Sequence, residues 1–142
     1  MIKKVRDVMT PDVETLEPSD SVEEAARKMR LFDAGLFPVC ETDRVVGVLT
    51  DRDITLRVTA EGRDPAATRV ADVMTREPAC VGEDADLWEA ARVLCERRVR
   101  RLPVLDRRGR LVGLISVGRL AKMKEEKLAG HILKAVVGPR AL

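Results

Sequence analysis

Asparagine, glutamine and tyrosine are absent from the 142-residue sequence, and histidine occurs once, as His131. A lack of amides together with 35% charged residues is typical of heat-adapted proteins, which favour ion pairs over thermolabile side chains. A GC-rich genome produces the same bias. Two explanations of the composition are therefore open, a thermophilic source and a codon preference.

The sequence also has few residues that could hold a metal ion or form a disulfide framework. Its three cysteines, Cys40, Cys80 and Cys95, are far apart and lie in apolar surroundings, which favours a reducing compartment. No C-x-x-C or H-x-x-x-H spacing accompanies the single histidine. We therefore expect a cytoplasmic protein with no metal site and no required cofactor, in which His131 is structural.

Long apolar runs are missing as well. None approaches the roughly 18 residues that a membrane span needs, and the opening "MIKKVRDVM" lacks the apolar segment of a secretory signal. The net charge is only +2, from 26 basic and 24 acidic residues, so no overall field favours nucleic acid. The composition thus predicts no membrane partner and makes nucleic acid a weak candidate.

An internal repeat is the strongest feature that the sequence does contain. "VRDVMT" at 5–10 matches "VADVMT" at 70–75, "EAAR" at 24–27 matches 89–92, and "LFPV" at 36–39 meets "RLPV" at 101–104. One inserted residue in a later loop then aligns Thr50 with Ser116 and Asp53 with Arg119. We divide the chain into a first repeat at 1–62, a linker at 63–69, a second repeat at 70–122 and a C-terminal helical tail at 123–142.

Each repeat is predicted to have the element order β-α-β-β-α. Apolar residues at i, i+3, i+4 and i+7 predict one helix on Val22, Ala25, Ala26 and Met29 and another on Leu87, Ala90, Ala91 and Leu94. Asp20 and Glu23 form a possible capping box for the first of these. Strands at 37–40 and 45–49, and at 102–105 and 111–115, precede a second helix near Thr50 or Ser116. The fold class is α/β (α+β), with two repeats packed sheet to sheet about a pseudo-two-fold axis.

These motifs resemble a tandem pair of CBS domains, the Bateman module. The resemblance rests on "DVMT" at the start of each repeat, on "LFPV" and "RLPV", and on the Gly-apolar-apolar-Ser/Thr pattern that ends the third strand. It covers about 5–60 and 70–122, and it implies a regulatory module without catalysis that binds AMP, ADP, ATP or S-adenosylmethionine in a cleft between the repeats. The sequence itself contains no Ser–His–Asp set, metal cluster or P-loop.

The resemblance also implies which residues line the cleft. Thr50 and Asp53 match the T-x-x-D pattern that meets the ribose or phosphate of the ligand. The lining is completed by the segment after "VMT" and by the segment around the proline of the second strand. Arg100, Arg101 and the hydroxyl of Ser116 are further parts of it. The predicted nucleotide-binding residues are Pro11, Thr15, Gly35, Leu36, Phe37, Thr50, Asp53, Cys80, Val81, Arg100, Arg101 and Ser116.

Asp53 has two possible roles. Its carboxylate can accept both hydroxyl hydrogens of a ribose, with the free amides of the helix start near Thr50 attracting phosphate and Gly35 leaving room for a flat base. Alternatively, Thr50 and Asp53 form a capping box, worth about 1 kcal/mol without any ligand. In the second repeat Ser116 can cap, but Arg119 cannot accept hydroxyl hydrogens. We therefore expect one cleft of adenosine type, the other being lost or changed.

Two further features concern partners. Seven arginines lie between 97 and 110; Arg100 and Arg101 are candidates for phosphate contact, and a solvated helix end and turn is the alternative. Trp88 shares a helix side with Ala91 and Cys95 and is either an interface anchor or a core residue. We expect a homodimer with these three residues near its seam, and an unidentified protein partner.

A ligand-free interaction module is the second hypothesis, and nucleic-acid binding is a weaker third because the chain lacks an aromatic stacking platform.

Overall fold

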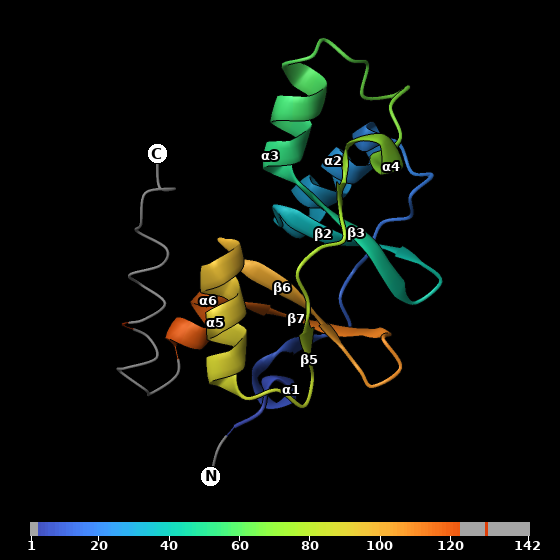
Figure 1. Cartoon of the computed structure of the whole chain (residues 1–142). Coiled ribbons are helices and arrows are strands. Elements are labelled where there is room, and N and C mark those ends of the chain that lie inside the picture. Colours follow the sequence, from blue (N-terminus) through green and yellow to red (C-terminus); the bar gives the residue numbers. More distant parts are fainter. Residues whose placement is uncertain (1–2, 123–129, 131–142) are drawn as a thin grey trace. The chain divides into compact units, whose positions relative to one another are not determined.

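The computed structural model describes residues 3–122 and 130, which belong to two compact units (Figure 1). One unit is Glu14–Pro78, which we call the Asp53 unit. The other combines Met1–Val13 with Ala79–Leu142, and we call it the Arg119 unit. The predicted tail at 123–142, including His131, lies outside the described residues except for Gly130.

The Asp53 unit has a three-stranded antiparallel sheet in the order β2-β3-β4. Helix α2 (Val22–Phe32) precedes the hairpin of β2 (Leu36–Glu41) and β3 (Arg44–Thr50). The short helix α3 (Asp51–Ile54) follows directly and continues into the π-helical turn η1 (Thr55–Thr59). The unit ends with α4 (Val70–Val73) and β4 (Thr75–Arg76).

The Arg119 unit has a four-stranded sheet in the order β1-β7-β6-β5, in which only β5 and β6 are parallel. Its first elements are α1 (Val5–Val8) and β1 (Thr10–Pro11), and β5 (Val81–Gly82) and α5 (Leu87–Arg97) come next. The hairpin of β6 (Arg101–Leu105) and β7 (Leu111–Ser116) leads into α6 (Val117–Ala121). The predicted α/β class and both predicted hairpins are confirmed.

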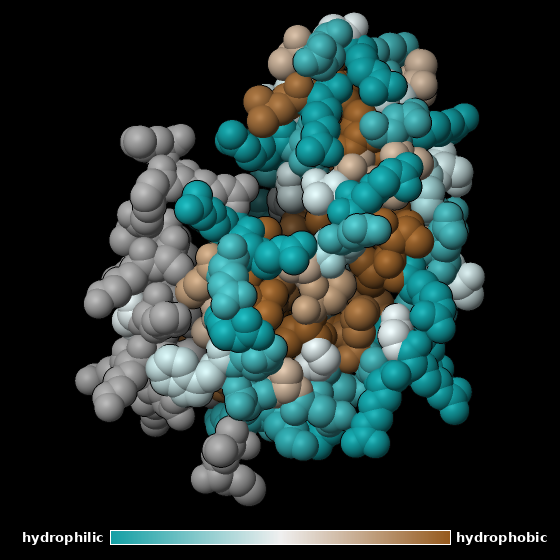
Figure 2. All heavy atoms as spheres, in the orientation of Figure 1, coloured by the Kyte–Doolittle hydropathy of each residue, from teal (hydrophilic) through white to brown (hydrophobic). Residues whose placement is uncertain are grey.

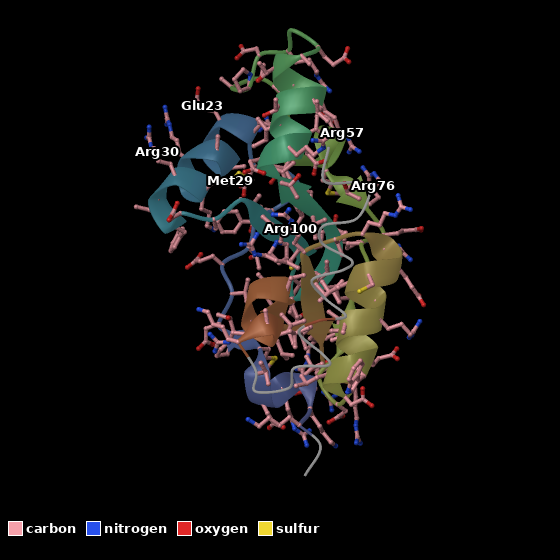
Figure 3. All side chains as sticks on the ribbon, turned by 90° about the vertical axis from the view of Figure 1, so that its left-hand side faces the viewer. Glu23, Met29, Arg30, Arg57, Arg76 and Arg100 are labelled. Carbon is pink, nitrogen blue, oxygen red and sulfur yellow. The ribbon has the colours of Figure 1, made fainter. Side chains whose placement is uncertain are left out.

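The two long helices bury the predicted apolar faces with one exception. Val22, Ala25 and Met29 of α2 are buried, as are Leu87, Ala90, Ala91 and Leu94 of α5, but Ala26 is exposed. In Figure 3, Glu23 and Arg30 project outward from α2, whereas Met29 points back into the unit. Hydrophilic side chains cover much of the face seen in Figure 2, in keeping with the high charged fraction of the sequence.

The predicted capping box of Asp20 and Glu23 is wrong by one residue. Ser21 is the N-cap of α2, and its side chain accepts a hydrogen bond of 3.1 Å from the amide of Glu24. The Asp20 carboxylate instead accepts from the amide of Glu17 at 2.9 Å. Because serine and aspartate are both good N-caps, the pattern alone does not distinguish adjacent candidates.

Each unit is completed by the "DVMT" segment of the other repeat. Strand β4 pairs with β3, where Val48 faces Thr75, and β1 pairs with β7, where Thr10 faces Leu114. The valines of α4 and α1 are buried in the same cores, as Val70 and Val73 and as Val5 and Val8. The repeats of the sequence and the compact units of the structure therefore have different boundaries.

Two glycines allow these edge segments to approach the hairpins closely. A Cβ atom at Gly113 would lie 2.6 Å from the sulfur of Met9 and 2.8 Å from the carbonyl oxygen of Thr10. A Cβ atom at Gly47 would lie 2.7 Å from the sulfur of Met74 and 2.8 Å from the carbonyl oxygen of Thr75. Since one of the atoms met in each case belongs to the backbone, moving a flexible side chain would not remove the clash.

We therefore expect Gly47→Ala and Gly113→Ala each to lower the free energy of unfolding by about 1–3 kcal/mol, the usual cost of overpacking. Gly82→Ala is the matched control, because Gly82 lies in β5 with open space around its α carbon. Urea unfolding of the three variants measures the difference. Equal stability of Gly113→Ala and Gly82→Ala would contradict the close approach of Met9.

Candidate functional site

The corner between β3 and α3 brings together four of the predicted residues of the Asp53 unit. Leu36, in the first position of β2, pairs with Thr50, the last residue of β3. The carbonyl of Gly35 accepts a hydrogen bond of 3.0 Å from the amide of Asp51, which fixes the start of α3 beside the start of β2. Asp53 follows in the first turn of that helix.

Thr50 and Asp53 form a reciprocal capping box. The hydroxyl of Thr50 accepts from the amide of Asp53 at 3.0 Å, and Oδ2 of Asp53 accepts from the amide of Thr50 at the same distance. Both residues are half-buried. Oδ1 of Asp53 accepts no hydrogen bond from any residue that the structure describes. The carboxylate thus caps the helix with one oxygen and keeps the acceptor capacity of the other.

Gly35 lies against the side chain of Asp51. A Cβ atom at this position would lie 2.9 Å from Oδ2 of Asp51, so the space beside its α carbon is filled by the carboxyl group of Asp51. Phe37 is likewise no surface for stacking, because its side chain is only 3% exposed and meets the ring of Phe32 edge-on at 6.3 Å. The Phe37 ring is therefore not available for stacking at this corner.

Thr15 lies in the same unit and is connected to Phe37 by a residue that the sequence analysis missed. The ammonium group of Lys28 donates to the carbonyl of Thr15 at 2.5 Å and lies 5.7 Å from the centre of the Phe37 ring. Lys28 is also paired with Glu14. The only signal for Lys28 in the sequence is that the second repeat has Val93 at the matching position.

The Arg119 unit gathers the remaining predicted residues. Arg101 pairs with Ser116 across β6 and β7, and the carbonyl of Arg100, just before β6 (Figure 3), accepts from the amide of Val117 at 2.9 Å. Both arginines are exposed. Pro11 pairs with Gly113 in the same sheet, and β5 brings Val81, which is buried, next to β6. Cys80 directly precedes Val81.

The corner of the Arg119 unit keeps the cap but not the carboxylate. The hydroxyl of Ser116 accepts from the amide of Arg119 at 3.0 Å, like that of Thr50 in the other unit. The side chain of Arg119 reaches a different partner, since its Nε donates to the carbonyl of Val8 at 2.9 Å. Val8 is the last residue of α1, so Arg119 holds the "DVMT" segment in the unit.

Arg57 makes the equivalent contact in the Asp53 unit. Its Nη1 donates to the carbonyls of Val73 at 2.9 Å and Met74 at 3.2 Å, at the end of α4. In Figure 3, Arg57 lies on the side of the unit where α4 is found. The two units therefore hold their edge segments with arginines at different positions of the repeat. In the Arg119 unit the arginine is Arg119, which aligns with Asp53 of the first repeat.

Two cysteines at the predicted sites are not activated as nucleophiles. Burial raises the pKa of the Cys80 thiol, and nearby Arg97 opposes this only in part. Burial and the charge of Glu96 raise the pKa of Cys95. A raised pKa keeps each group as a thiol near neutral pH, and the thiolate is the nucleophile. None of the three cysteines forms a disulfide.

The predicted interface residues differ in exposure. Trp88 is 45% exposed on α5, and Cys95 is half-buried. Ala91 is completely buried in the core of the Arg119 unit, so it is not part of the surface that carries Trp88. Of the three residues, Trp88 and Cys95 are therefore accessible to a partner and Ala91 is not.

A hollow of about 340 Å³ in the Asp53 unit contains none of the predicted site residues and is lined by Glu17, Pro18, Ser19, Cys40, Glu41 and Thr42. A hollow of about 300 Å³ in the Arg119 unit is lined by ion pairs such as Arg107 with Asp84 and Arg110 with Asp106, and it contains none of the predicted residues. Among residues 3–122 and 130, no three histidine, cysteine, aspartate or glutamate side chains are placed to hold a metal ion. No helix within those residues has the length and apolarity needed to cross a bilayer.

Each repeat starts with a "DVM" helix, continues through a long helix and a hairpin, and ends in a hydroxyl-capped corner, and this doubled arrangement defines a class of paired domains. The family model of the CBS domain matches residues 5–59 and again 70–126. This chain belongs to the CBS-domain family.

Relatives cover nearly the whole chain. CBS domain-containing protein YhcV of Bacillus subtilis is 39% identical over 120 residues, 84% of each chain. Hypoxic response protein 1 of Mycobacterium tuberculosis is 33% identical over 138 residues, 96% of each chain. The crystal structure of Hypoxic Response Protein I with two coordinated zinc ions has a TM-score of 0.80 at 32% identity, covering 87% of this chain and 100% of that one. CBSX2 in complex with AMP has a TM-score of 0.70 at 31% identity, covering 82% and 91%.

The contact made by Arg119 leads to a prediction about stability. Arg119→Met removes a charged hydrogen-bond donor from the carbonyl of the buried residue Val8, so the free energy of unfolding should fall by about 1 kcal/mol. Arg108→Met, at an exposed position in the β6–β7 turn, is the control and should be neutral. Both are measured by urea unfolding. An Arg119→Met variant as stable as the control would mean that the contact contributes nothing.

Proposed function

We propose that this CBS pair is a non-catalytic regulatory module that binds an adenosine nucleotide at the Asp53 corner, with AMP, ATP and S-adenosylmethionine as candidate ligands. The observation that supports the proposal is the geometry of Asp53, which caps α3 through Oδ2 and leaves Oδ1 as an acceptor at the corner where Thr50 pairs with Leu36 of β2. A carboxylate in that position is suited to a ribose hydroxyl. The structure of a relative, CBSX2, in complex with AMP also supports it.

The same reasoning favours one adenosine site for each chain. At the matching position of the second repeat, Arg119 is a donor and its Nε is already bonded to the carbonyl of Val8. A guanidinium cannot accept hydroxyl hydrogens, so a ribose has no equivalent partner there. Arg100 and Arg101 are exposed at that corner of the Arg119 unit and stay our candidates for phosphate contact, and Ser116, Pro11, Cys80 and Val81 stay predicted lining residues of the same unit.

Calorimetric titration with AMP separates capping from ligand binding. Asp53→Asn keeps a side-chain oxygen for the amide of Thr50 but loses the charge and the second acceptor. It should bind AMP about tenfold or more weakly, as expected when a charged hydrogen bond is lost, with an almost unchanged melting temperature. Asp53→Ala should lose both binding and stability. The unmodified chain should bind one AMP per chain.

Contrary outcomes would point to the second candidate, a ligand-free interaction module. If AMP, ATP and S-adenosylmethionine all give no heat at millimolar concentration, the nucleotide site is refuted. If Asp53→Asn binds AMP as tightly as the unmodified chain does, Asp53 only caps the helix. Salt-sensitive retention of DNA would instead revive the weaker nucleic-acid hypothesis.

We also propose that the module forms a homodimer with Trp88 at the seam and transmits ligand binding to a protein partner in the cytoplasm. The exposure of Trp88 supports this, because large aromatic residues anchor interfaces, and Cys95 lies two turns further along the same side of α5. Trp88→Ala should convert the dimer to a monomer in sedimentation velocity, while Leu31→Ala, which removes an even more exposed apolar side chain from α2, should not. A monomeric unmodified chain at micromolar concentration would contradict the proposal.

A further inference from the structure

The two surface hollows occupy the same place in the two repeats. Four lining residues of the first hollow align with four of the second, namely Pro18, Ser19, Glu41 and Thr42 with Glu83, Asp84, Asp106 and Arg107. Both lie beside the turn of a hairpin (Figure 1). In the first hairpin Glu41 pairs with Arg44 next to the turn, whereas Thr50 of the capped corner is at the other end of β3. The hollows are therefore separate from the nucleotide site proposed for the corner.

The hollow of the Asp53 unit is acidic. Its lining contains Glu17 and Glu41 and no basic residue. Both glutamates are exposed, and neither forms an ion pair with any residue that the structure describes. This surface therefore carries two carboxylates whose charge no neighbouring cation neutralises.

The hollow of the Arg119 unit has an excess of arginine. Three acidic residues lie in its lining with four arginines, which are Arg6, Arg107, Arg108 and Arg110. Asp84 pairs with Arg6 and Arg107, and Asp106 pairs with Arg110. Arg108 is exposed in the turn and has no ion pair among residues 3–122 and 130. The turn between β6 and β7 thus presents positive charge to the solvent.

The charges of the whole units differ in the same direction. The Asp53 unit contains nine basic and fourteen acidic residues, which gives a net charge of −5. The described part of the Arg119 unit, at 3–13 and 79–122, contains thirteen basic and eight acidic residues, which gives +5. The small net charge of the chain hides this asymmetry because the two units cancel. Opposite charges on two surfaces favour an association in which unlike surfaces meet.

Trp88 lies at the same end of the Arg119 unit as the arginine hollow. It is in the first turn of α5, and the lining residues Glu83 and Asp84 come just before that helix. An interface anchored by Trp88 therefore brings the arginine-bearing turn close to the partner copy. If the partner presented the same end, the arginines of two turns would be opposed, and like charges in contact weaken binding. The acidic end of the Asp53 unit avoids this repulsion.

We propose that two copies of this chain pair antiparallel, with the β6–β7 turn of each copy against the Glu17–Glu41 hollow of the other. This inference rests on the proposed homodimer and extends it, because it assigns the surface that the Trp88 end meets. In a dimer with two-fold symmetry the contact occurs twice, since the surfaces of the two copies exchange roles. Charge complementarity thus selects the antiparallel arrangement over the parallel one, in which each unit meets its own copy.

Arg108→Glu tests the contact by sedimentation equilibrium at low salt. The substitution breaks no ion pair among the described residues, so the melting temperature should stay the same. It opposes acid to acid at both copies of the contact, and the dissociation constant of the dimer should rise about tenfold. Arg30→Glu, in the last turn of α2, changes the net charge equally and is the control. In about 1 M salt, where screening acts beyond about 3 Å, the two variants should dimerise alike.

Charge reversal at both ends distinguishes the two arrangements. One variant carries Arg107→Glu with Arg108→Glu, and a second carries Glu17→Lys with Glu41→Lys. Each alone should dimerise weakly, and an equimolar mixture of the two should form heterodimers. A chain with all four substitutions exchanges the signs of its ends and should pair about as tightly as the unmodified chain. In a parallel dimer neither variant would weaken pairing, because like charges are already opposed there.

The possible failures are distinguishable. Unchanged dissociation constants in both reversal variants would overturn the antiparallel contact and leave the homodimer intact, and so would a chain with all four substitutions that pairs as weakly as either variant. A monomeric unmodified chain would overturn both proposals.

Discussion

The close approach of a methionine to a glycine is the contact on which the rest of the structure depends. Met9 lies over Gly113 and Met74 over Gly47, at distances that leave no room for a Cβ atom. This contact lets the edge strands β1 and β4 pair with the hairpins, and it accompanies the burial of Val5, Val8, Val70 and Val73. It also brings the end of α1 within hydrogen-bond distance of Arg119 and the end of α4 within hydrogen-bond distance of Arg57.

The difference between the two corners follows from that geometry. Both corners start a helix with a hydroxyl cap, so the third helical residue is close to the start of the helix in each. A carboxylate at this position turns back to the cap amide, as Asp53 does, whereas a guanidinium reaches outward to the carbonyl of Val8, as in Arg119. In the Asp53 unit Arg57 donates to the carbonyls of the edge segment instead. Position 53 therefore does not need an arginine and can carry an acidic residue.

Much of this fold could be predicted from the sequence because apolar periodicity and turn residues act locally. The hairpins, the two long helices and the hydroxyl-capped corners all follow from such patterns, and Gly109, in the turn between β6 and β7, has a positive φ of the kind that glycine favours. The exchange of the edge segments could not be predicted, since β1 and β4 have two residues each and carry no pattern of their own. The roles of Gly35 and Lys28 depend on Asp51, Thr15 and Phe37, which are brought to them only by tertiary packing.

The way the chain passes between the units has a consequence for its integrity. It leaves the Arg119 unit after Val13 and returns to it at Ala79, so each unit contains parts of both halves of the polypeptide. The loop at 61–67 is exposed throughout, as a protease requires. Cleavage there would yield two fragments, each lacking a strand that the other carries, and the nicked protein would persist as a complementing pair instead of two independent domains.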